Sequence, residues 1–234
     1  MAKIAVLGYG TVGSGVVEVL NTNGASIAKR AGDTIEFKSV LDLRDFPGDP
    51  IQDKIVHDID LIINDPEIEV VVEVMGGVEP AFTFVKKALE AGKSVCTSNK
   101  ALVAAHGPEL LEMAKERRLN FMFEASVGGG IPIIRPLNQS LTADEITKIT
   151  GILNGTTNYI LTKMSREGIS YQEVLKEAQA LGYAERNPEA DVEGYDACRK
   201  IAILTSLAFG NTVKFEEVYT AVSYTHLRAH ETLA

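Results

Sequence analysis

The chain has 234 residues, with 23 basic and 32 acidic side chains, a formal net charge of −9 and a hydrophobic fraction of 45%. This length is sufficient for one large domain or two small ones, each with its own core. The negative charge, without any long run of Lys or Arg, excludes nucleic acid as an expected partner.

Targeting and redox signals are also missing from the sequence. No apolar run has the length of a signal-peptide core or a membrane span. The two cysteines, Cys96 and Cys198, lie in no CxxC motif and have no histidine nearby, as is typical of a reducing compartment. We therefore expect a cytoplasmic protein with no membrane partner.

The first half of the chain alternates short apolar strands with helices. The predicted strands are residues 3–7, 35–43, 70–75, 94–97 and 120–125, and the predicted helices are 12–20, 80–90 and 108–118. Residues 21–34 form a polar stretch, and Gly92 and Gly107 are expected at helix ends or turns. Apolar strands that alternate with helices predict an α/β fold with a doubly wound parallel sheet of the Rossmann type.

The second half of the chain has a different pattern of predicted elements, with more helix and less strand. One predicted strand, 146–153, precedes three predicted helices, 157–166, 171–181 and 192–208. We therefore expect a dinucleotide-type domain at 1–130 and a second α+β domain at 131–220. The last residues, 221–234, extend no periodic element and are expected to be a foreign tail.

A glycine-rich turn follows the first strand. Gly8, Gly10 and Gly13 form G-x-G-x-x-G at the start of the first helix. In this motif the first glycine allows the turn, the second admits a pyrophosphate and the third packs the helix on the strand. Since exposed helix N–H groups bind the anion, we expect a dinucleotide here.

The sequence leaves the choice of dinucleotide open. Asp42, at the end of the second predicted strand, is a candidate for binding the ribose hydroxyls, although it comes later than usual in the motif. Arg44 is a candidate for binding a 2′-phosphate, because guanidinium pairs bidentately with phosphate. NAD and NADP therefore both remain as cofactors.

The densest ionisable cluster lies in the second half, in GYAERNPEADVEGYDACRK. Asp196 and Lys200 are four residues apart and fall on the apolar row of a helix predicted to begin near residue 192. An ordinary surface ion pair explains this spacing. A desolvated lysine that exchanges a proton with a substrate oxygen explains it too.

Two further charged side chains follow strands of the predicted sheet. Lys100 comes after the fourth strand, where a doubly wound sheet binds its ligand, or it is a solvated loop lysine. Glu124 ends the fifth strand beside SVGGGIP, which is either a hinge or a cation site made with backbone carbonyls. His57 and His106 have no spaced partner, and the spacing of His226 and His230 lacks a third zinc ligand, so we assign no metal to these histidines.

These motifs together resemble the homoserine dehydrogenase family, with a match to about residue 220. The segments that carry the resemblance are IAVLGYGTVGSGV, EVMGG, TSNKALVA, FEASVGGGIPIIRPL, GILNGTTNYIL and GYAERNPEADVEGYDACRK. The resemblance implies an oxidoreductase that interconverts L-homoserine and aspartate 4-semialdehyde with NAD or NADP, in threonine, methionine and isoleucine biosynthesis. It also implies a homodimer formed through the second domain.

The resemblance assigns roles to individual residues. It implies that Lys200 donates a proton to the carbonyl, that Lys100 assists near the nicotinamide, and that Asp196 belongs to the same pocket. The substrate would be held by Glu185 and Asp191. The cofactor residues it implies are Gly8, Tyr9, Gly10, Thr11, Val12, Gly13, Asp42, Arg44 and Lys100.

The resemblance further implies a structural sodium ion at Glu124 and the carbonyls of Val127, Gly129 and Ile131. In the family the catalytic core continues beyond the segment VKFEEVYT. In this chain we expect the match to the family to end before the tail. The alternative to an active enzyme is therefore a catalytically incompetent fragment that only binds dinucleotide.

Overall fold

The computed structural model describes residues 1–184 and 188–220. The chain divides into two compact units, Met1–Ile133 and Ile134–Ala234. We describe each unit by itself; the sequence pattern placed the corresponding boundary near residue 130.

The first unit is built on a parallel six-stranded sheet with the order β3-β2-β1-β4-β5-β6. Its strands are β1 (Ala2–Leu7), β2 (Ile35–Leu41), β3 (Ile55–Val56), β4 (Ile68–Glu73), β5 (Ser94–Thr97) and β6 (Phe121–Met122). The order reverses at β1, which pairs with both β2 and β4, and this reversal is where doubly wound sheets bind ligands. The predicted doubly wound parallel sheet is confirmed.

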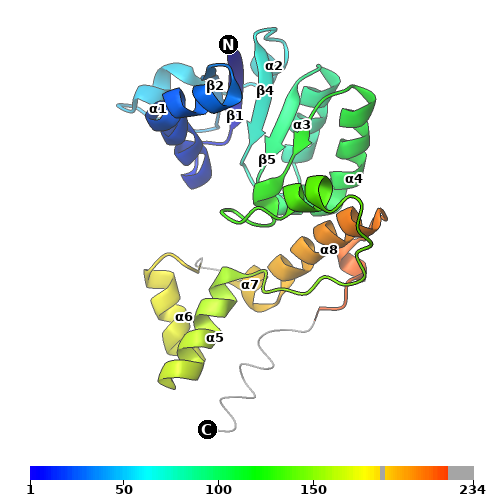
Figure 1. The fold of residues 1–234 in the computed structure, drawn as a ribbon. Coiled ribbons are helices and arrows are strands. Elements are labelled where there is room, and N and C mark those ends of the chain that lie inside the picture. Colours follow the sequence, from blue (N-terminus) through cyan, green and yellow to red (C-terminus); the bar gives the residue numbers. More distant parts are fainter. Residues whose placement is uncertain (185–187, 221–234) are drawn as a thin grey trace. The chain divides into compact units, whose positions relative to one another are not determined.

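Helices connect the strands by parallel crossovers. The main ones are α1 (Thr11–Ala31), α3 (Ala81–Glu90) and α4 (Lys100–Glu116), and α2 (Asp60–Ile63) is a single turn. Figure 1 shows α1 beside β2 at one end of the sheet and α3 and α4 beside β4 and β5 at the other. The central strands are covered as a result: Ala5, Val6, Leu7 and Val71 are completely buried, as expected for a parallel sheet.

Two helices differ from the prediction for the first unit. The helix predicted at 12–20 is longer, because the polar residues 21–31 continue α1 as far as the cap at Gly32, which has the left-handed φ of +78°. The helix predicted to begin at 108 begins instead at Lys100, because the Asn99 side chain accepts a hydrogen bond from Leu102 N–H and caps it. Gly107 is accordingly inside α4 and not at a turn.

The strand ends also differ by a few residues. The second strand stops at Leu41, so Leu43 is outside it and 94% exposed. The strand predicted at 120–125 is only Phe121–Met122, because a 3₁₀ turn, η2 (Glu124–Ser126), follows it directly. The short elements β3, α2 and η1 (Pro50–Lys54) have too little periodicity to be predicted.

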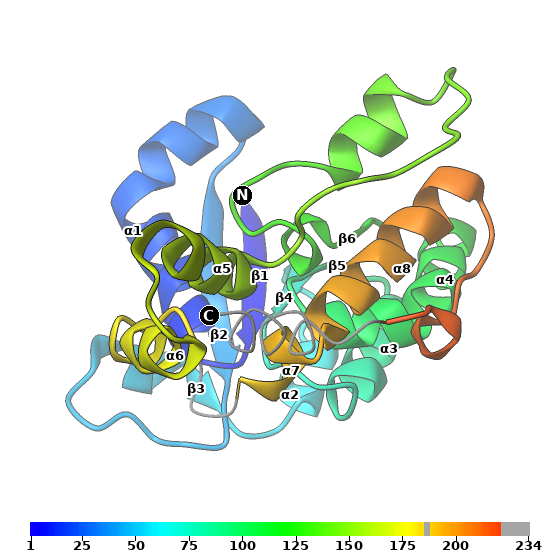
Figure 2. The same ribbon diagram turned by 90° about the horizontal axis from the view of Figure 1, so that it is seen from below.

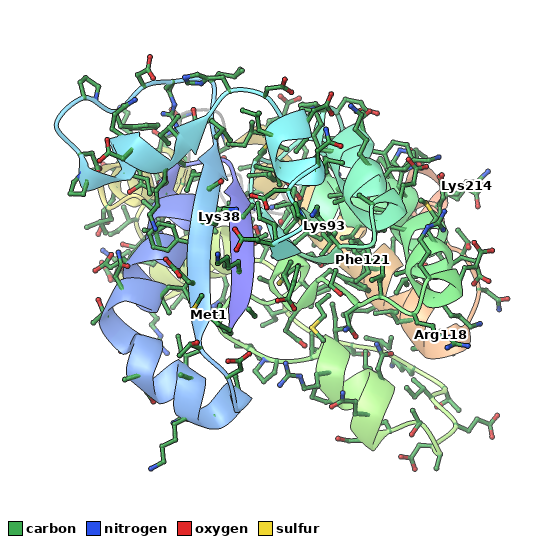
Figure 3. The ribbon with its side chains drawn as sticks, turned by 90° about the horizontal axis from the view of Figure 1, so that it is seen from above. Met1, Lys38, Lys93, Arg118, Phe121 and Lys214 are labelled. Carbon is green, nitrogen blue, oxygen red and sulfur yellow. The ribbon has the colours of Figure 1, made fainter. Side chains whose placement is uncertain are left out.

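A network of charges ties the strands together at their amino ends. Lys38 bonds to both Asp65 and Glu67, and Lys3 bonds to Glu67 at 2.5 Å. The nearly buried Lys93 donates to the carbonyls of Asp65 and Ile68 at 2.7 and 2.8 Å. Figure 3 shows Met1, Lys38 and Lys93 at this end of the sheet, opposite the end at which a doubly wound sheet binds its ligand.

In its described residues the second unit consists of helices. They are α5 (Gly155–Glu167), α6 (Tyr171–Ala180), α7 (Glu189–Val192) and α8 (Tyr195–Phe209), with short turns η3 (Pro136–Ser140) and η4 (Phe215–Glu217). Figure 2 shows α5 and α6 side by side. They share a core of Ile160, Met164 and Val174.

Two predictions for the second unit are wrong. Residues 146–153 are not a strand, because no described strand of this unit pairs with them, and an isolated strand is not stable. The helix predicted at 192–208 is broken by Gly194, which has a φ of +81° and separates α7 from α8.

None of the helices within the described residues is long and apolar enough to cross a membrane.

Candidate active site

The three glycines after β1 have distinct structural roles. Gly8 has a φ of +98°, and a Cβ there would lie 3.0 Å from Met75 Cγ. A Cβ on Gly13 would lie 1.9 Å from the Gly8 carbonyl oxygen, so only glycine lets α1 approach β1 this closely. A Cβ on Gly10 would meet nothing within 4 Å, which leaves the turn open to a ligand. These are the three functions that the dinucleotide motif requires.

A cavity of about 500 Å³ opens beside this turn, at the carboxyl ends of β1, β2 and β4. Its walls include Tyr9, Asp42, Arg44, His57, Met75 and Pro80. Gly10, the N-cap residue of α1, lines the cavity; the helix begins with Thr11 and Val12 directly after it, and no described side chain caps its N-terminus. Its free N–H groups suit an anionic group such as a pyrophosphate.

Asp42 is bonded on every side within this cavity. Its Oδ2 accepts from Tyr9 N–H at 2.8 Å and from Arg44 Nη2 at 3.0 Å. Its Oδ1 accepts from the Arg44 backbone N–H at 2.9 Å and from Arg44 Nε at 3.0 Å. A carboxylate has about four lone-pair positions, so the acceptor capacity of Asp42 is used within the protein.

Arg44 is the exposed member of this pair. Its side chain is 62% exposed, against 9% for Asp42, and its Nη2 also donates to the Tyr9 carbonyl at 3.0 Å. The hydrogen bonds from the Arg44 side chain hold the pKa of Asp42 well below its usual range. The same bonds raise the pKa of Arg44, so the cavity edge holds a charged guanidinium paired with an ionised carboxylate.

The structure also brings His57 to the cavity, although its sequence context marked it as ordinary. Its Nδ1 lies 2.7 Å from the Asp42 carbonyl oxygen and its Nε2 lies 3.2 Å from Asp45 Oδ1. The bond to the Asp42 carbonyl raises the pKa of His57. The position follows from β3, whose two residues carry too weak a signal to be recognised in sequence.

Lys100 lies at a helix start and not in a loop. The chain leaves β5 at Thr97, and Asn99 caps α4, so that Lys100 is the first residue of the helix. Its position beyond the carboxyl end of β5 agrees with the predicted ligand edge of the sheet.

In the second unit, Asp196 and Lys200 form a buried ion pair on α8. The distance from Lys200 Nζ to Asp196 Oδ2 is 2.9 Å, and the side chains are 16% and 2% exposed. Lys200 Nζ also donates to the Leu153 carbonyl at 2.9 Å. The interpretation of the i, i+4 spacing as a solvated surface pair is therefore wrong, because the face of α8 that carries both side chains is largely buried.

Asn154 organises the same cluster and was not singled out by sequence. Its Nδ2 donates to Asp191 Oδ1 at 2.7 Å and to Asp196 Oδ2 at 2.9 Å. Its Oδ1 accepts from Thr157 N–H at 2.8 Å and so caps α5. The NGTT segment, an asparagine followed by a helical pattern, is the capping signal that could have revealed it. Glu185 lies outside the described residues, as does the segment 221–234.

The segment after β6 folds back on Glu124. The Glu124 Oε1 atom accepts from Ile133 N–H at 2.5 Å. Gly128 leaves room for the Ile131 carbonyl oxygen, which lies 2.4 Å from the point that a Cβ on Gly128 would occupy. Within the described residues no group of three or more His, Cys, Asp or Glu side chains is arranged to hold a metal ion.

The sheet order, the glycine turn and the cavity define a dinucleotide-binding protein of the doubly wound class. The family described as "Homoserine dehydrogenase, NAD binding domain" matches residues 8–124, and "Homoserine dehydrogenase" matches residues 132–231. The chain belongs to the homoserine dehydrogenase family. The second match runs on past residue 220, where we expected the resemblance to end.

Individual relatives agree with this assignment. The chain is 50% identical over 221 residues to a homoserine dehydrogenase from Synechocystis, covering 92% of this chain and 50% of the relative. The crystal structure of a homoserine dehydrogenase from Thiobacillus denitrificans has a TM-score of 0.89 and 41% identity, covering 99% of this chain and 55% of that one. A hyperthermophilic archaeal homoserine dehydrogenase mutant in complex with NADPH has a TM-score of 0.78 and 30% identity, covering 93% of this chain and 75% of that one. The chain spans about half the length of the curated relatives it matches.

Proposed function

We propose that the chain catalyses the NAD(P)-dependent interconversion of L-homoserine and aspartate 4-semialdehyde. The observation that carries the proposal is the buried pair of Lys200 and Asp196, which accompanies a complete dinucleotide cavity in a member of this family. When bound, the nicotinamide supplies or accepts the hydride.

In this proposal Lys200 moves the proton. An ammonium group has three N–H donors, and Lys200 directs two of them to Asp196 and the Leu153 carbonyl. Among the described residues the third N–H has no acceptor, and in this proposal it is directed to the substrate oxygen. In the reductive direction the Lys200 ammonium donates a proton to the carbonyl oxygen and becomes a neutral amine; in the oxidative direction the neutral amine accepts the hydroxyl proton. Asn154 holds Asp191 and Asp196 in place, Lys100 assists the proton transfer, and Glu185 and Asp191 bind the substrate.

The cavity favours NADP(H) in this proposal. Asp42 has no lone pair left for ribose hydroxyls, because Tyr9 and Arg44 occupy its oxygens. Arg44 is exposed at this edge. Its Nε and Nη2 donate to Asp42 and Tyr9, and in the described residues its Nη1 has no acceptor, so the Nη1 N–H groups would donate to a phosphate. That a relative forms a complex with NADPH supports this choice of cofactor.

A sodium ion is part of the same proposal. The inward-turned Ile131 carbonyl and the Glu124 carboxylate are oxygen ligands of the kind that hard cations prefer. Glu124 with the carbonyls of Val127, Gly129 and Ile131 would hold the ion and stabilise the end of the first unit.

We further propose a homodimer formed through the second unit. In the described chain, residues 146–153 belong to no helix or sheet, and Ile152 is 81% exposed. Such a segment is suited to pairing with another copy.

The test is formation of NAD(P)H from L-homoserine by the purified chain, followed at 340 nm. Lys200→Arg keeps the charge that pairs with Asp196, but an arginine does not release its proton. We expect this variant to bind dinucleotide normally and to lose turnover by about 10²- to 10⁴-fold.

Lys214→Ala is the matched control, because Lys214 is 70% exposed in the same unit and pairs only loosely with Glu217. It should turn over like the unmodified chain. If the unmodified chain binds dinucleotide but shows no turnover, the catalytic proposal is wrong and the alternative of a dinucleotide-binding fragment is correct.

A further inference from the structure

Glu73, the last residue of β4, carries a carboxylate that is completely buried. Its Oε1 accepts from Met75 N–H at 2.8 Å and from Asn99 Nδ2 at 3.4 Å, and its Oε2 accepts from Thr97 Oγ1 at 2.5 Å. In the part of the chain that the structure describes, these donors are all uncharged. A buried carboxylate without a cationic partner is costly, so a role beyond filling space is indicated.

One side of this group faces the cofactor cavity. Met75 and Gly76 are in the cavity wall, and Met75 packs so closely on Gly8 that a Cβ there would lie 3.0 Å from Met75 Cγ. Gly76 and Gly77 both have left-handed φ values, +83° and +74°. The bond from Met75 N–H to Glu73 therefore fixes the start of a sharp turn that supports the glycine loop.

The other side faces the start of α4. Asn99 Nδ2 donates to the Gly77 carbonyl at 2.6 Å as well as to Glu73, and Asn99 N–H donates to Thr97 Oγ1 at 2.9 Å. The Oδ1 atom of the same Asn99 caps the helix whose first residue is Lys100. Glu73 thus contacts both the turn in the cavity wall and the cap that places Lys100.

We propose that Glu73 is a positioning residue that couples the cofactor loop to the Lys100 end of α4. Both carboxyl oxygens are used as acceptors: Oε1 accepts from Met75 on the turn side and from Asn99 on the helix side, and Oε2 accepts from Thr97. The catalytic part of this inference rests on the proposed dehydrogenase function; the binding part rests on the dinucleotide cavity alone.

The decisive variant is Glu73→Gln, which keeps the size of the side chain. A carboxamide has one acceptor oxygen, so either Met75 N–H or Thr97 Oγ1 loses its acceptor. We expect the Kd for NADPH, measured by fluorescence on the full chain, to rise about tenfold. If the chain turns over, kcat should fall as well, because Lys100 is displaced.

Two controls separate positioning from stability. Val71→Ala empties a buried position on the same strand and should lower the Tm while leaving the Kd for NADPH unchanged. Thr97→Val removes the hydroxyl that bonds to Glu73 and should weaken NADPH binding, whereas Thr97→Ser restores the hydroxyl and should rescue it.

The outcomes separate this inference from the proposed function. If the unmodified chain binds NADPH and Glu73→Gln binds equally well, the coupling is refuted while the proposed function stands. The coupling is also refuted if Val71→Ala raises the Kd as much as Glu73→Gln does. An unmodified chain that does not bind dinucleotide at all would overturn both.

Discussion

Arg44 shows how hydrogen bonds can reassign the role of a single residue. Spacing alone made Asp42 and Arg44 equal candidates for reading the ribose, since both follow β2. In the structure Asp42 holds Arg44 and the Tyr9 peptide, and Arg44 remains exposed. The glycine turn, Asp42 and Arg44 could be predicted from sequence as cofactor residues, whereas His57 could not. The separate roles of Asp42 and Arg44 could not be predicted either, because they depend on which lone pairs are filled.

Arg44→Ala should therefore change the cofactor preference. Loss of a charged hydrogen-bonded contact to phosphate is worth about 2 kcal/mol, so the Kd for NADPH should rise about 30-fold. The Kd for NADH should stay the same or fall, because the oxygens of Asp42 become available to ribose hydroxyls. Fluorescence titration of both cofactors measures this.

Arg30→Ala provides the comparison for that experiment. Arg30 lies in the last turn of α1, about 30 Å along the helix from the glycine turn, and its removal should leave both affinities unchanged. Equal weakening of NADPH and NADH by Arg44→Ala would mean that the guanidinium does not read the 2′-phosphate.

Among the secondary-structure elements, α4 shows why only part of the architecture could be predicted from the sequence. A glycine and a proline at 107 and 108 are typical of a helix start, so the prediction began there. The Asn99 cap and the packing of Leu102 and Val103, both buried, override that local signal. The same limit applies to residues 146–153, whose β-branched pattern needs a partner strand that pattern alone cannot supply.

The Asn154 side chain caps α5 with its oxygen and donates to Asp191 and Asp196 with its nitrogen. A substitution that keeps the oxygen but loses the N–H donors therefore tests the second role alone. Asn154→Asp keeps the oxygen that caps α5 but replaces the donor to Asp191 and Asp196 with a third negative charge. We expect a loss of about 2 kcal/mol in the free energy of unfolding at neutral pH, measured by urea denaturation.

Ser170→Asp is a suitable reference for that experiment, because it also places a carboxylate at a helix N-cap, in this case that of α6, where the acidic neighbour Glu173 is exposed to solvent and not buried. It should change the stability by less than about 0.5 kcal/mol. If the two variants are equally stable, the two hydrogen bonds from Asn154 to the carboxylates contribute nothing.

The whole molecule consists of two units with separate cores, and every residue named in the cofactor cavity belongs to the first. Residues 1–133 should therefore bind NADPH on their own. We expect a Kd within about threefold of that of the full chain, a difference of roughly 0.6 kcal/mol, by isothermal titration.

Gly13→Ala in the same fragment should abolish that binding, because its Cβ would lie 1.9 Å from the Gly8 carbonyl oxygen. A folded fragment that binds NADPH far more weakly than the full chain would show that the second unit takes part in holding the cofactor.

The peptide of Tyr9 is held from both directions, at its N–H by Asp42 and at its carbonyl by Arg44. The loop that must receive a pyrophosphate is thus already ordered before any ligand arrives. The conformational entropy of this segment is lost when the chain folds and not when the cofactor binds. Association of the cofactor is then limited by diffusion and desolvation more than by rearrangement of the loop. Because Asp42 and Arg44 already hold the Tyr9 peptide, we expect cofactor binding to be rapid and to occur in a single kinetic step.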